Sequence, residues 1–239
     1  MEKQKTIVSM FDEIAPTYDI ANRALSFGVD THWRKKGCEL ALQLLETKHL
    51  TKIVDVATGT GDMMTYWRKA AKMLHRQVDA YLGIDPSEGM LYVAKQKFPD
   101  IEFLLASADA LPLEDASADI ISISYGIRNV VARQKAIEEF YRVLKPGGAL
   151  VILEFTKIHR TGLMGRIVDF YLEEVLPLIG GLISRNFRAY RYLPDSIEGF
   201  LTCESLSAEL QNGGFDVKEA QSFSFNISTL IIAQKPATV

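Results

Sequence analysis

The chain has 239 residues, a length that fits one domain, and nearly half of them are apolar, which is enough for a sizeable core. The net charge of −3 and the lack of an arginine-rich or aromatic-interleaved patch argue against a nucleic-acid partner. The two cysteines match no metal-binding spacing and fit a reducing compartment, and the four histidines are scattered, so no metal site is expected.

At the N-terminus, residues 1–6 lack a long apolar core after their charges, which argues against a secretory signal. No apolar run reaches the ~20 residues that a membrane span needs, so a cytoplasmic protein is expected. Residues 7–32 mix aromatic and polar groups without a clean period. We interpret them as part of a short helical arm that folds over another part of the protein.

Helices and strands alternate through most of the remaining chain. Helices are predicted at 33–45, from 63 onward, at 87–98, at 132–144 and near 205–211. Strands are predicted at 53–56, 80–85, 101–105, 118–124 and 150–154, with an antiparallel hairpin near 215–220 and 223–233. A turn is expected at Lys145–Gly148, between a helix and a strand. This alternation predicts a parallel sheet whose ligands lie at the carboxyl ends of the strands.

The segment D-V-A-T-G-T-G-D, residues 55–62, carries the strongest chemical signal. It joins a strand to a helix through Gly59 and Gly61, and such a turn forms a cradle for a nucleotide-sized ligand. A dinucleotide site would have a third glycine, where this chain has Met64. The carboxylates at both ends of the segment would repel a pyrophosphate and suit a positively charged ligand, such as S-adenosylmethionine (SAM). The alternative is an acidic turn in an unrelated α/β protein.

The second strand ends at Asp85, about 20 residues beyond the glycine turn, where nucleoside-binding folds place an acid that accepts hydrogen bonds from ribose hydroxyls. The alternative role for Asp85 is to cap the helix that begins near Ser87, because Asp and Ser favour helix starts. The two roles are compatible with each other.

Residues 160–200 interrupt the alternation of strands and helices. A helical apolar stripe between 163 and 172 precedes an apolar run at 175–183 that is too short to span a bilayer. Two interpretations stay open: a buried helical insertion, or an oily lid or groove for a lipid-like substrate that touches a membrane interface.

Further motifs follow the other strands: G-I-D at 83–85, A-D-A-L-P at 108–112 and K-P-G-G at 145–148. Together with the glycine turn, they resemble class I SAM-dependent methyltransferases. The blocks at 18–34 and 142–155 are similar to the two signatures of the quinone-biosynthesis C-methyltransferases (UbiE/MenG family). Residues 124–130 and 190–197 match as well, so the resemblance covers nearly the whole chain. The chain departs from the family pattern at Asp30 (usually His), Thr156 (usually Ser) and the segment 224–227 (usually glycine-rich).

The resemblance implies an α/β fold with a Rossmann-like, seven-stranded sheet that is mostly parallel, has an antiparallel C-terminal strand and carries helices on both faces. It implies a single domain over residues 1–239, with the arm at about 1–32 and a substrate lid at about 157–200. The implied cofactor is SAM. The implied reaction is methyl transfer to a ring carbon of a prenylated quinol: demethylmenaquinol, a benzoquinol precursor of ubiquinone, or both. The resemblance allows peripheral membrane contact and a homodimer.

The resemblance also assigns site residues. The cofactor-binding set is Asp55, Thr58, Gly59, Gly61, Asp85, Ser107, Ala108, Asp109 and Ser124. Within this set, the turn at 58–61 is expected at the methionine end of the cofactor, Asp85 at the ribose, and Asp109 with its two neighbours against the adenine. The catalytic set is Tyr18, Asp19, Arg128 and Asn129.

The catalytic roles follow from the acidity of a quinol. Arg128 is expected to stabilise the quinolate while the proton leaves to water or Asp19, and Asn129 to hold the second oxygen. The alternative for Arg128 is a structural salt bridge to a neighbouring acid such as Asp19.

Three other functions remain to be compared with this one. A methyltransferase for a soluble phenol or amine would share the cofactor motifs but have a polar insertion, whereas residues 163–183 are apolar. A dehydrogenase is disfavoured by Met64 and the acidic flanks of the glycine turn. A non-catalytic SAM-binding subunit of a quinone-synthesis complex would be expected to lose the blocks at 18–19 and 128–129, and both are present.

Overall fold

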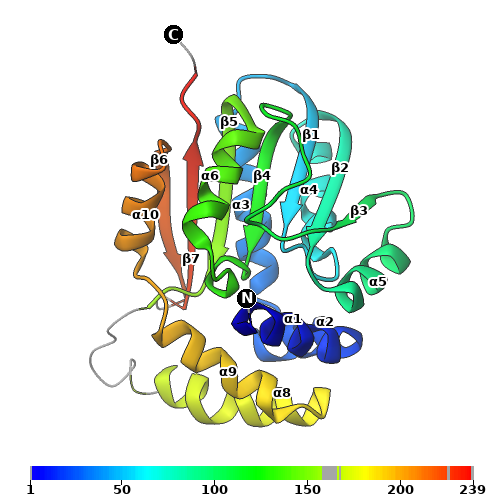
Figure 1. Ribbon diagram of the computed structural model, residues 1–239, viewed down its shortest axis with the longest axis vertical. Coiled ribbons are helices and arrows are strands. Elements are labelled where there is room, and N and C mark those ends of the chain that lie inside the picture. Colours follow the sequence, from blue (N-terminus) through cyan, green and yellow to red (C-terminus); the bar gives the residue numbers. More distant parts are fainter. Residues whose placement is uncertain (1, 158–165, 167, 225–226, 238–239) are drawn as a thin grey trace.

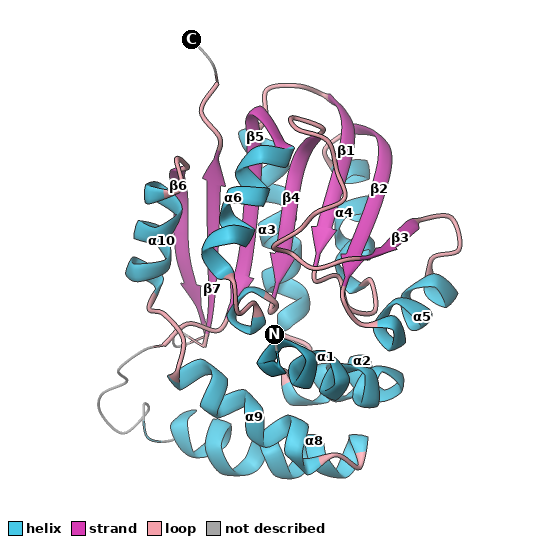
Figure 2. Ribbon diagram, viewed as in Figure 1, coloured by secondary structure: helices cyan, strands magenta, loops and turns pink. Residues whose placement is uncertain are grey.

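A computed structural model describes residues 2–157, 166, 168–224 and 227–237. Its strands form one seven-stranded sheet in the order β3-β2-β1-β4-β5-β7-β6 (Figure 2). The strands are β1 (His49–Val56), β2 (Gln77–Asp85), β3 (Glu102–Leu105), β4 (Ala118–Ser124), β5 (Leu144–Glu154), β6 (Asp216–Phe223) and β7 (Ser228–Gln234). The strands from β3 to β5 pair in parallel, while β7 is antiparallel to both of its neighbours. The predicted sheet with an antiparallel C-terminal strand is therefore confirmed.

Helices cover both faces of the sheet (Figure 1). The helices around the sheet are α3 (Asp30–Leu44), α4 (Asp62–Met73), α5 (Glu88–Lys97), α6 (Arg133–Val143) and α10 (Cys203–Asn212). One apolar core joins α6 and α10 to the sheet, and a second joins α3 and α4 to the opposite face. The central strand β4 is buried from Ala118 to Ile123, as expected for a parallel strand covered on both faces.

Three strands begin earlier than predicted, and one expected turn is wrong. The early residues of β1 and β2 are mostly exposed and polar, and each stretch holds a single apolar residue, Leu50 or Val78, which is too little to predict a strand. The predicted turn at Lys145–Gly148 lies inside β5, which starts at Leu144, immediately after α6. Gly147 takes a left-handed φ of 78° there, and the register of β5 against β4 shifts in the same region. The Pro-Gly-Gly motif therefore makes an irregular strand start, not a loop.

A short helix, η2 (Ile127–Asn129), follows β4, and a group of other helices forms a layer below the carboxyl edge of the sheet (Figure 1). This layer contains the arm helices α1 (Glu2–Ile14), η1 (Ala15–Thr17) and α2 (Tyr18–Leu25), the π-helical turn η3 (Tyr171–Val175), α8 (Leu176–Ser184) and α9 (Phe187–Glu198). Apolar side chains of the arm and of η3, α8 and α9 form a third core, so the arm lies between the sheet edge and the α8–α9 pair.

The first part of the apolar stripe predicted at 163–172 includes Leu163, Met164 and Ile167, which lie outside the described residues. No helix within the described ranges has both the length and the apolar character needed to cross a membrane.

Candidate active site

Two cavities lie between the carboxyl edge of the sheet and the helices below it. The strand-end cavity is bounded by the loops after β1, β2, β3 and β4, and its wall includes Gly59, Asp85, Ser107, Ala108, Ser124 and Asn129. The helix-lined cavity lies between the arm, α3, η3 and α9, and its wall includes Arg34, Arg128, Phe155, Leu172, Tyr190 and Leu193.

The two cavities meet at aromatic side chains. Phe11, Tyr18 and Tyr125 line both of them. The arrangement therefore provides two ligand sites that share one aromatic junction.

The turn after β1 is shaped by left-handed backbone conformations. Ala57, Gly59 and Gly61 have φ values of 51°, 56° and 79°. At Gly59, a Cβ atom would have no neighbour closer than 3.9 Å, so the space above this residue is open to a ligand. At Gly61, a Cβ atom would come within 3.1 Å of the Phe98 ring, so this glycine permits close packing. Gly59 is on the cavity wall, whereas Gly61 is not among its described lining residues.

Asp85 reaches the strand-end cavity from the end of β2. Its carboxylate accepts hydrogen bonds from the backbone N–H groups of Gly59 and Ser87, at 2.8 and 2.9 Å. Burial raises the pKa of Asp85 to about 6, although both N–H groups act in the opposite direction. The residue that caps α5 is Ser87, whose hydroxyl accepts a hydrogen bond from the Met90 N–H group; Asp85 supports this cap through the Ser87 N–H group and also lines the cavity.

Asp55 and Thr58 face each other below the glycine turn and do not belong to the described cavity wall. The Asp55 carboxylate accepts hydrogen bonds from the hydroxyls of Thr58 and Ser122, at 2.7 and 2.6 Å. Burial raises the pKa of Asp55 to about 6, and the two hydroxyls only partly oppose this rise. Asp55 and Thr58 therefore support the glycine turn through hydrogen bonds and do not form part of the described cavity wall.

Ser107 and Ala108 line the strand-end cavity, whereas Asp109 does not belong to its described wall. The Asp109 carboxylate instead accepts a hydrogen bond from the Ser107 hydroxyl. On the far side of the cavity, the buried Ser124 Oγ has no hydrogen-bond partner among the described residues. A buried hydroxyl without a partner requires an explanation, and a ligand in this cavity would supply the missing partner.

Arg128 lines the helix-lined cavity and forms a buried ion pair with Glu154 at 2.5 Å, with side-chain exposures of 6% and 0%. It also donates to the carbonyl of Tyr125 at 2.7 Å and to the Ser196 hydroxyl at 3.2 Å. Burial raises the pKa of Glu154, and the Arg128 cation opposes that rise. The salt bridge considered as the alternative role of Arg128 is therefore present, with Glu154 as the partner in place of Asp19.

Asn129 lies on the wall of the strand-end cavity. Its Oδ1 accepts a hydrogen bond from the Tyr192 hydroxyl at 2.9 Å, and its Nδ2 donates to the Tyr125 carbonyl at 3.5 Å. The structure thus separates Asn129 from the cavity that Arg128 lines.

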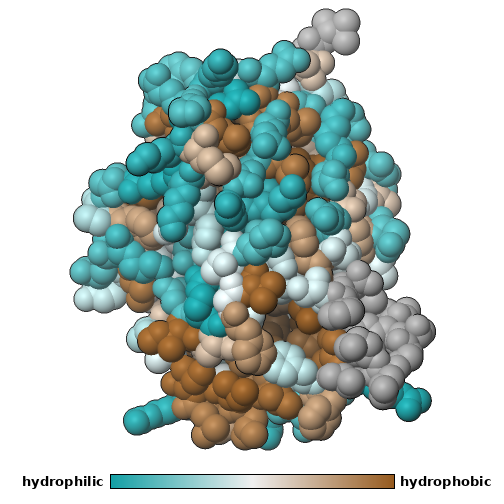
Figure 3. Space-filling view, turned by 180° about the vertical axis from the view of Figure 1, so that it is seen from behind, coloured by the Kyte–Doolittle hydropathy of each residue, from teal (hydrophilic) through white to brown (hydrophobic). Residues whose placement is uncertain are grey.

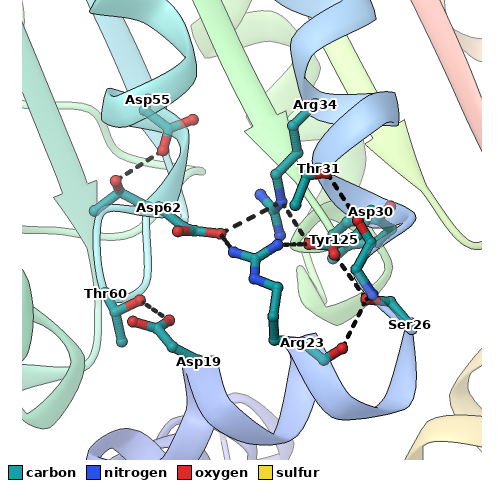
Figure 4. A network of polar contacts seen from close by, with 12 residues as sticks. Asp19, Arg23, Ser26, Asp30, Thr31, Arg34, Asp55, Thr60, Asp62 and Tyr125 are labelled. Carbon is teal, nitrogen blue, oxygen red and sulfur yellow. Dashed lines mark hydrogen bonds and ion pairs between the residues drawn. The ribbon is translucent and has the colours of Figure 1, made fainter.

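Tyr18 and Asp19 are adjacent in the arm but face different surroundings. Tyr18 lies at the junction of the two cavities, and burial raises its pKa. Asp19 belongs to the described wall of neither cavity. Its carboxylate accepts a hydrogen bond from the Thr60 hydroxyl at 2.5 Å (Figure 4) and pairs with Lys97 at 2.7 Å. These partners place Asp19 beside the glycine turn, away from the cavity that Arg128 lines.

An ion-pair network links the arm, α3 and the start of α4 (Figure 4). Arg23 contacts Asp30 at 2.5 Å and Asp62 at 2.6 Å. The buried Arg34 pairs with the same two acids through Nε, and its guanidinium lies 5.1 Å from the centre of the Tyr125 ring. The sequence analysis did not identify Arg23 or Arg34 as site residues. The available signal was Asp30, an acid at a position where the family usually has histidine.

The sequence is similar to known proteins over nearly its whole length. A profile of the ubiE/COQ5 methyltransferase family matches residues 1–235. The chain belongs to the ubiE/COQ5 methyltransferase family. It is 55% identical to the ubiquinone/menaquinone biosynthesis C-methyltransferase UbiE of Campylobacter jejuni, over 98% of this chain and 100% of the relative. It is 40% identical to a demethylmenaquinone methyltransferase of Chlorobaculum tepidum, over 98% of this chain and 94% of that protein.

Solved structures agree on the fold. A SAM-dependent methyltransferase from Thermotoga maritima superimposes with a TM-score of 0.59 and 21% identity, covering 96% of this chain and 99% of that chain. The [4+2]-cyclase SpnF gives a TM-score of 0.61 and 16% identity, covering 85% of this chain and 81% of that chain. A cyclase and a methyltransferase thus share this ubiE/COQ5 fold, so the reaction must be argued from the site.

The groups that line the strand-end cavity of this ubiE/COQ5 member suit a nucleoside ligand such as SAM. Gly59 leaves the backbone open to close approach, Asp85 offers carboxylate oxygens, and Ser124 offers a hydroxyl without a partner. These groups suit the amino-acid and ribose parts of a nucleoside ligand.

We predict that Asp55 makes unfolding depend on pH. Its folded pKa of about 6 lies above the ~3.9 of an unfolded Asp. Between these values the folded chain binds more protons, so the unfolding free energy falls as pH rises, and Asp55 lowers it by about 2–3 kcal/mol above pH 6. In Asp55→Asn, the hydroxyls of Thr58 and Ser122 can still bond to the amide, but the titration is lost. In urea denaturation, the unfolding free energy of the variant minus that of the wild type should therefore increase by about 2–3 kcal/mol from pH 4 to pH 7.

Gln221→Ala, at an exposed position on β6, is the control; it changes no titratable group, so its difference from the wild type should stay constant over the same pH range. A constant difference for Asp55→Asn as well would contradict the raised pKa.

Proposed function

We propose that this protein transfers a methyl group from SAM to a ring carbon of a prenylated naphthoquinol, converting demethylmenaquinol to menaquinol. The observation that carries the proposal is the junction at Phe11, Tyr18 and Tyr125 between two cavities. The cavity at the strand ends includes polar groups such as Asp85 and Ser124, and the cavity among the helices is more apolar. Such a junction lets a cofactor and a ring meet without bulk water between them. The activity named for the Campylobacter and Chlorobaculum relatives supports the same assignment.

The strand-end cavity holds the cofactor in this proposal. Asp85 accepts hydrogen bonds from the ribose hydroxyls, and Ser107 and Ala108 lie against the adenine. Gly59 and Ser124 contact the methionine end of the cofactor. Asp109 acts on this site by orienting the Ser107 hydroxyl. When bound, SAM supplies an electrophilic methyl group on a sulfonium.

The helix-lined cavity holds the quinol ring. A phenolic hydroxyl has a pKa near 10, so a quinol is mostly protonated at neutral pH and must lose a proton to become a strong carbon nucleophile. Arg128 stays charged, and its cation favours the quinolate while the proton passes to water. Glu154 holds Arg128 in place through their buried ion pair. Asp19 takes no part in this step, because Thr60 and Lys97 engage its carboxylate beside the glycine turn.

The prenyl tail occupies the apolar part of the helix-lined cavity. Its wall includes Leu25, Leu172, Leu176, Leu193, Ile197 and Ile227. The lining residues come from α9 as much as from η3 and α8, so the groove extends beyond the apolar segments at 163–172 and 175–183 into the rest of the lid predicted at about 157–200. This apolar wall favours a tailed quinol over a soluble phenol.

We also propose that α8 and α9 rest on the surface of an anionic bilayer, where a prenylated quinol resides. Phe170, Leu178, Leu182 and Phe187 are 62%, 57%, 65% and 43% exposed and define the α8–α9 patch. Figure 3 shows apolar surface gathered at this end of the molecule. The exposed Arg185 and Arg188 lie beside Leu182 and Phe187 in the chain, whereas the exposed acids Glu173 and Glu174 lie in η3. Apolar side chains with adjacent cations suit an anionic lipid surface.

Asp85 generates a prediction about cofactor affinity. Replacing Asp85 with Ala removes a charge-assisted acceptor, so calorimetry should show SAM binding weakened by about 1.5–3 kcal/mol. Wild-type affinity should also fall as pH drops through about 6, since the neutral carboxyl of Asp85 is a poorer acceptor. Asp109→Ala, in a neighbouring loop outside the described cavity wall, should lose less. Unchanged binding in Asp85→Ala would remove Asp85 from the site.

Arg128 and Glu154 generate the test of the reaction. Purified wild-type protein with SAM should methylate demethylmenaquinol, as detected by mass spectrometry, and do so faster than a demethoxy-benzoquinol. Replacing Arg128 alone would leave Glu154 buried without its counter-charge and destabilise the fold. The informative variant is therefore Arg128→Gln combined with Glu154→Gln, whose kcat should fall about 100-fold or more because the stabilising cation is gone.

The comparison variant is Glu154→Gln alone, which keeps the cation but removes its buried counter-charge, so its Tm should fall below that of the double variant while the protein that remains folded keeps a higher kcat. Higher pH should partly restore the double variant, because more quinol ionises without help. If the double variant keeps a near-normal kcat, Arg128 is structural; if wild-type protein methylates neither quinol, the proposed function is wrong.

The α8–α9 patch generates a prediction about membrane binding. Leu182→Asp places a charge in its most exposed position and should greatly reduce cosedimentation with vesicles of phosphatidylglycerol and phosphatidylcholine. Met73→Asp changes a comparably apolar side chain on α4, 48% exposed, and should leave vesicle binding unchanged. Equal binding by both variants would argue against this surface.

A further inference from the structure

The hydroxyl of Tyr190 has no hydrogen-bond partner, although it lies in the wall of the helix-lined cavity. Tyr190 is 5% exposed, and its oxygen is one of four buried side-chain polar atoms without a partner in the described parts of the chain. Two of those four atoms belong to the two cavities of the candidate site: Ser124 Oγ to the strand-end cavity and Tyr190 Oη to the helix-lined cavity. A buried hydroxyl without a partner costs free energy, and so calls for a partner that the protein itself does not supply.

The ring of Tyr190 is held in place by a glycine on the neighbouring helix. A Cβ atom at Gly180 in α8 would lie 2.2 Å from Cδ1 of Tyr190, so only glycine allows the ring to pack so closely. The next residue, Gly181, receives Phe187 in the same way. The position of the Tyr190 hydroxyl is thus set by packing between two helices.

Three other polar side chains in the wall of this cavity already have protein partners. Arg128 pairs with Glu154, and the Tyr192 hydroxyl donates to Asn129. The Tyr171 hydroxyl donates to the Leu25 carbonyl at 2.5 Å. Burial raises the pKa of Tyr190, and nearby Tyr18 adds to the rise, so the hydroxyl keeps its proton and can donate it.

A quinol ring carries two oxygens, and the proposed function uses Arg128 for only one of them. Asn129 was expected at the second oxygen, but it lines the other cavity and is engaged by Tyr192. We infer that the Tyr190 hydroxyl donates a hydrogen bond to the second ring oxygen and thereby selects a quinol over a monophenol. This inference rests on the proposed function, because it requires the ring to lie in the helix-lined cavity.

The test compares Tyr190→Phe with the wild type in binding three ligands. The probes are a short-tailed prenyl-1,4-naphthoquinol, kept reduced under argon, and the two prenyl-naphthols that each lack one of its hydroxyls. Binding is measured by calorimetry on protein saturated with S-adenosylhomocysteine, which binds without donating a methyl group. Tyr190→Phe should weaken quinol binding about five- to tenfold, the effect of one neutral hydrogen bond. The same loss should appear with one naphthol and disappear with the other, which lacks the oxygen that faces Tyr190.

Tyr171→Phe is the matched control, because it removes a hydroxyl from the same cavity that does have a protein partner. It should lower Tm and weaken all three ligands alike, whereas Tyr190→Phe should leave Tm unchanged or raise it. An equal loss for all three ligands in Tyr190→Phe, no loss for any, or no binding of the quinol to the wild type would each overturn the inference.

Methyl transfer by the wild type is measured separately, so the two proposals can fail independently. Selective binding through Tyr190 without methylation would leave the inference standing and overturn the proposed function. Methylation without any selective effect of Tyr190→Phe would do the reverse.

Discussion

The attachment of the N-terminal arm to the sheet edge is the constraint on which the rest of the site depends. Three arm residues contact the turns that form the strand-end cavity. Asp12 accepts hydrogen bonds from the Ser87 hydroxyl and the Gly89 N–H group at the start of α5, Asp19 contacts Thr60, and Arg23 pairs with Asp62 at the start of α4. Partly exposed contacts of this kind are individually weak. Together with the third apolar core, they hold the arm against the same turns that would contact a cofactor.

The arm also supplies two of the three aromatic side chains at which the two cavities meet. Its helices bring Phe11 and Tyr18 to the junction, opposite Tyr125 at the end of β4. Tyr125 has a left-handed φ of 57°, and a Cβ atom at the following Gly126 would lie 2.5 Å from the Cβ of Ala57. Such backbone strain is found at functional sites, where the surrounding structure maintains it. Here the buried Arg34, anchored by Asp30 and Asp62 and placed over the Tyr125 ring, is part of that surrounding structure.

The features that depend on local sequence pattern and on the order of the strands could be predicted from the sequence. The sheet follows from apolar runs between helices, and Gly59 and Asp85 follow from a turn and an acid at the ends of neighbouring strands. Pairings between distant segments could not be predicted in this way. The partner of Arg128 is Glu154, 26 residues away on β5. We had expected Asp19 as the partner, because both residues were assigned to the same catalytic set. Tyr190 was beyond prediction for another reason: its importance lies in a missing partner, which only a three-dimensional environment reveals.

The polar groups of the site are unfavourable to folding, and this is informative about function. Burial raises the pKa values of Asp55 and Asp85 to about 6, so both carboxylates destabilise the fold at neutral pH. Ser124 and Tyr190 leave two hydroxyls buried without partners. These costs are concentrated at the carboxyl edge, while the strands behind it are almost continuously apolar and stabilise the sheet. The unpartnered hydroxyls lie one in each cavity, so each ligand would restore one missing hydrogen bond, and the two ligands would be recognised separately on either side of the Tyr18–Tyr125 junction.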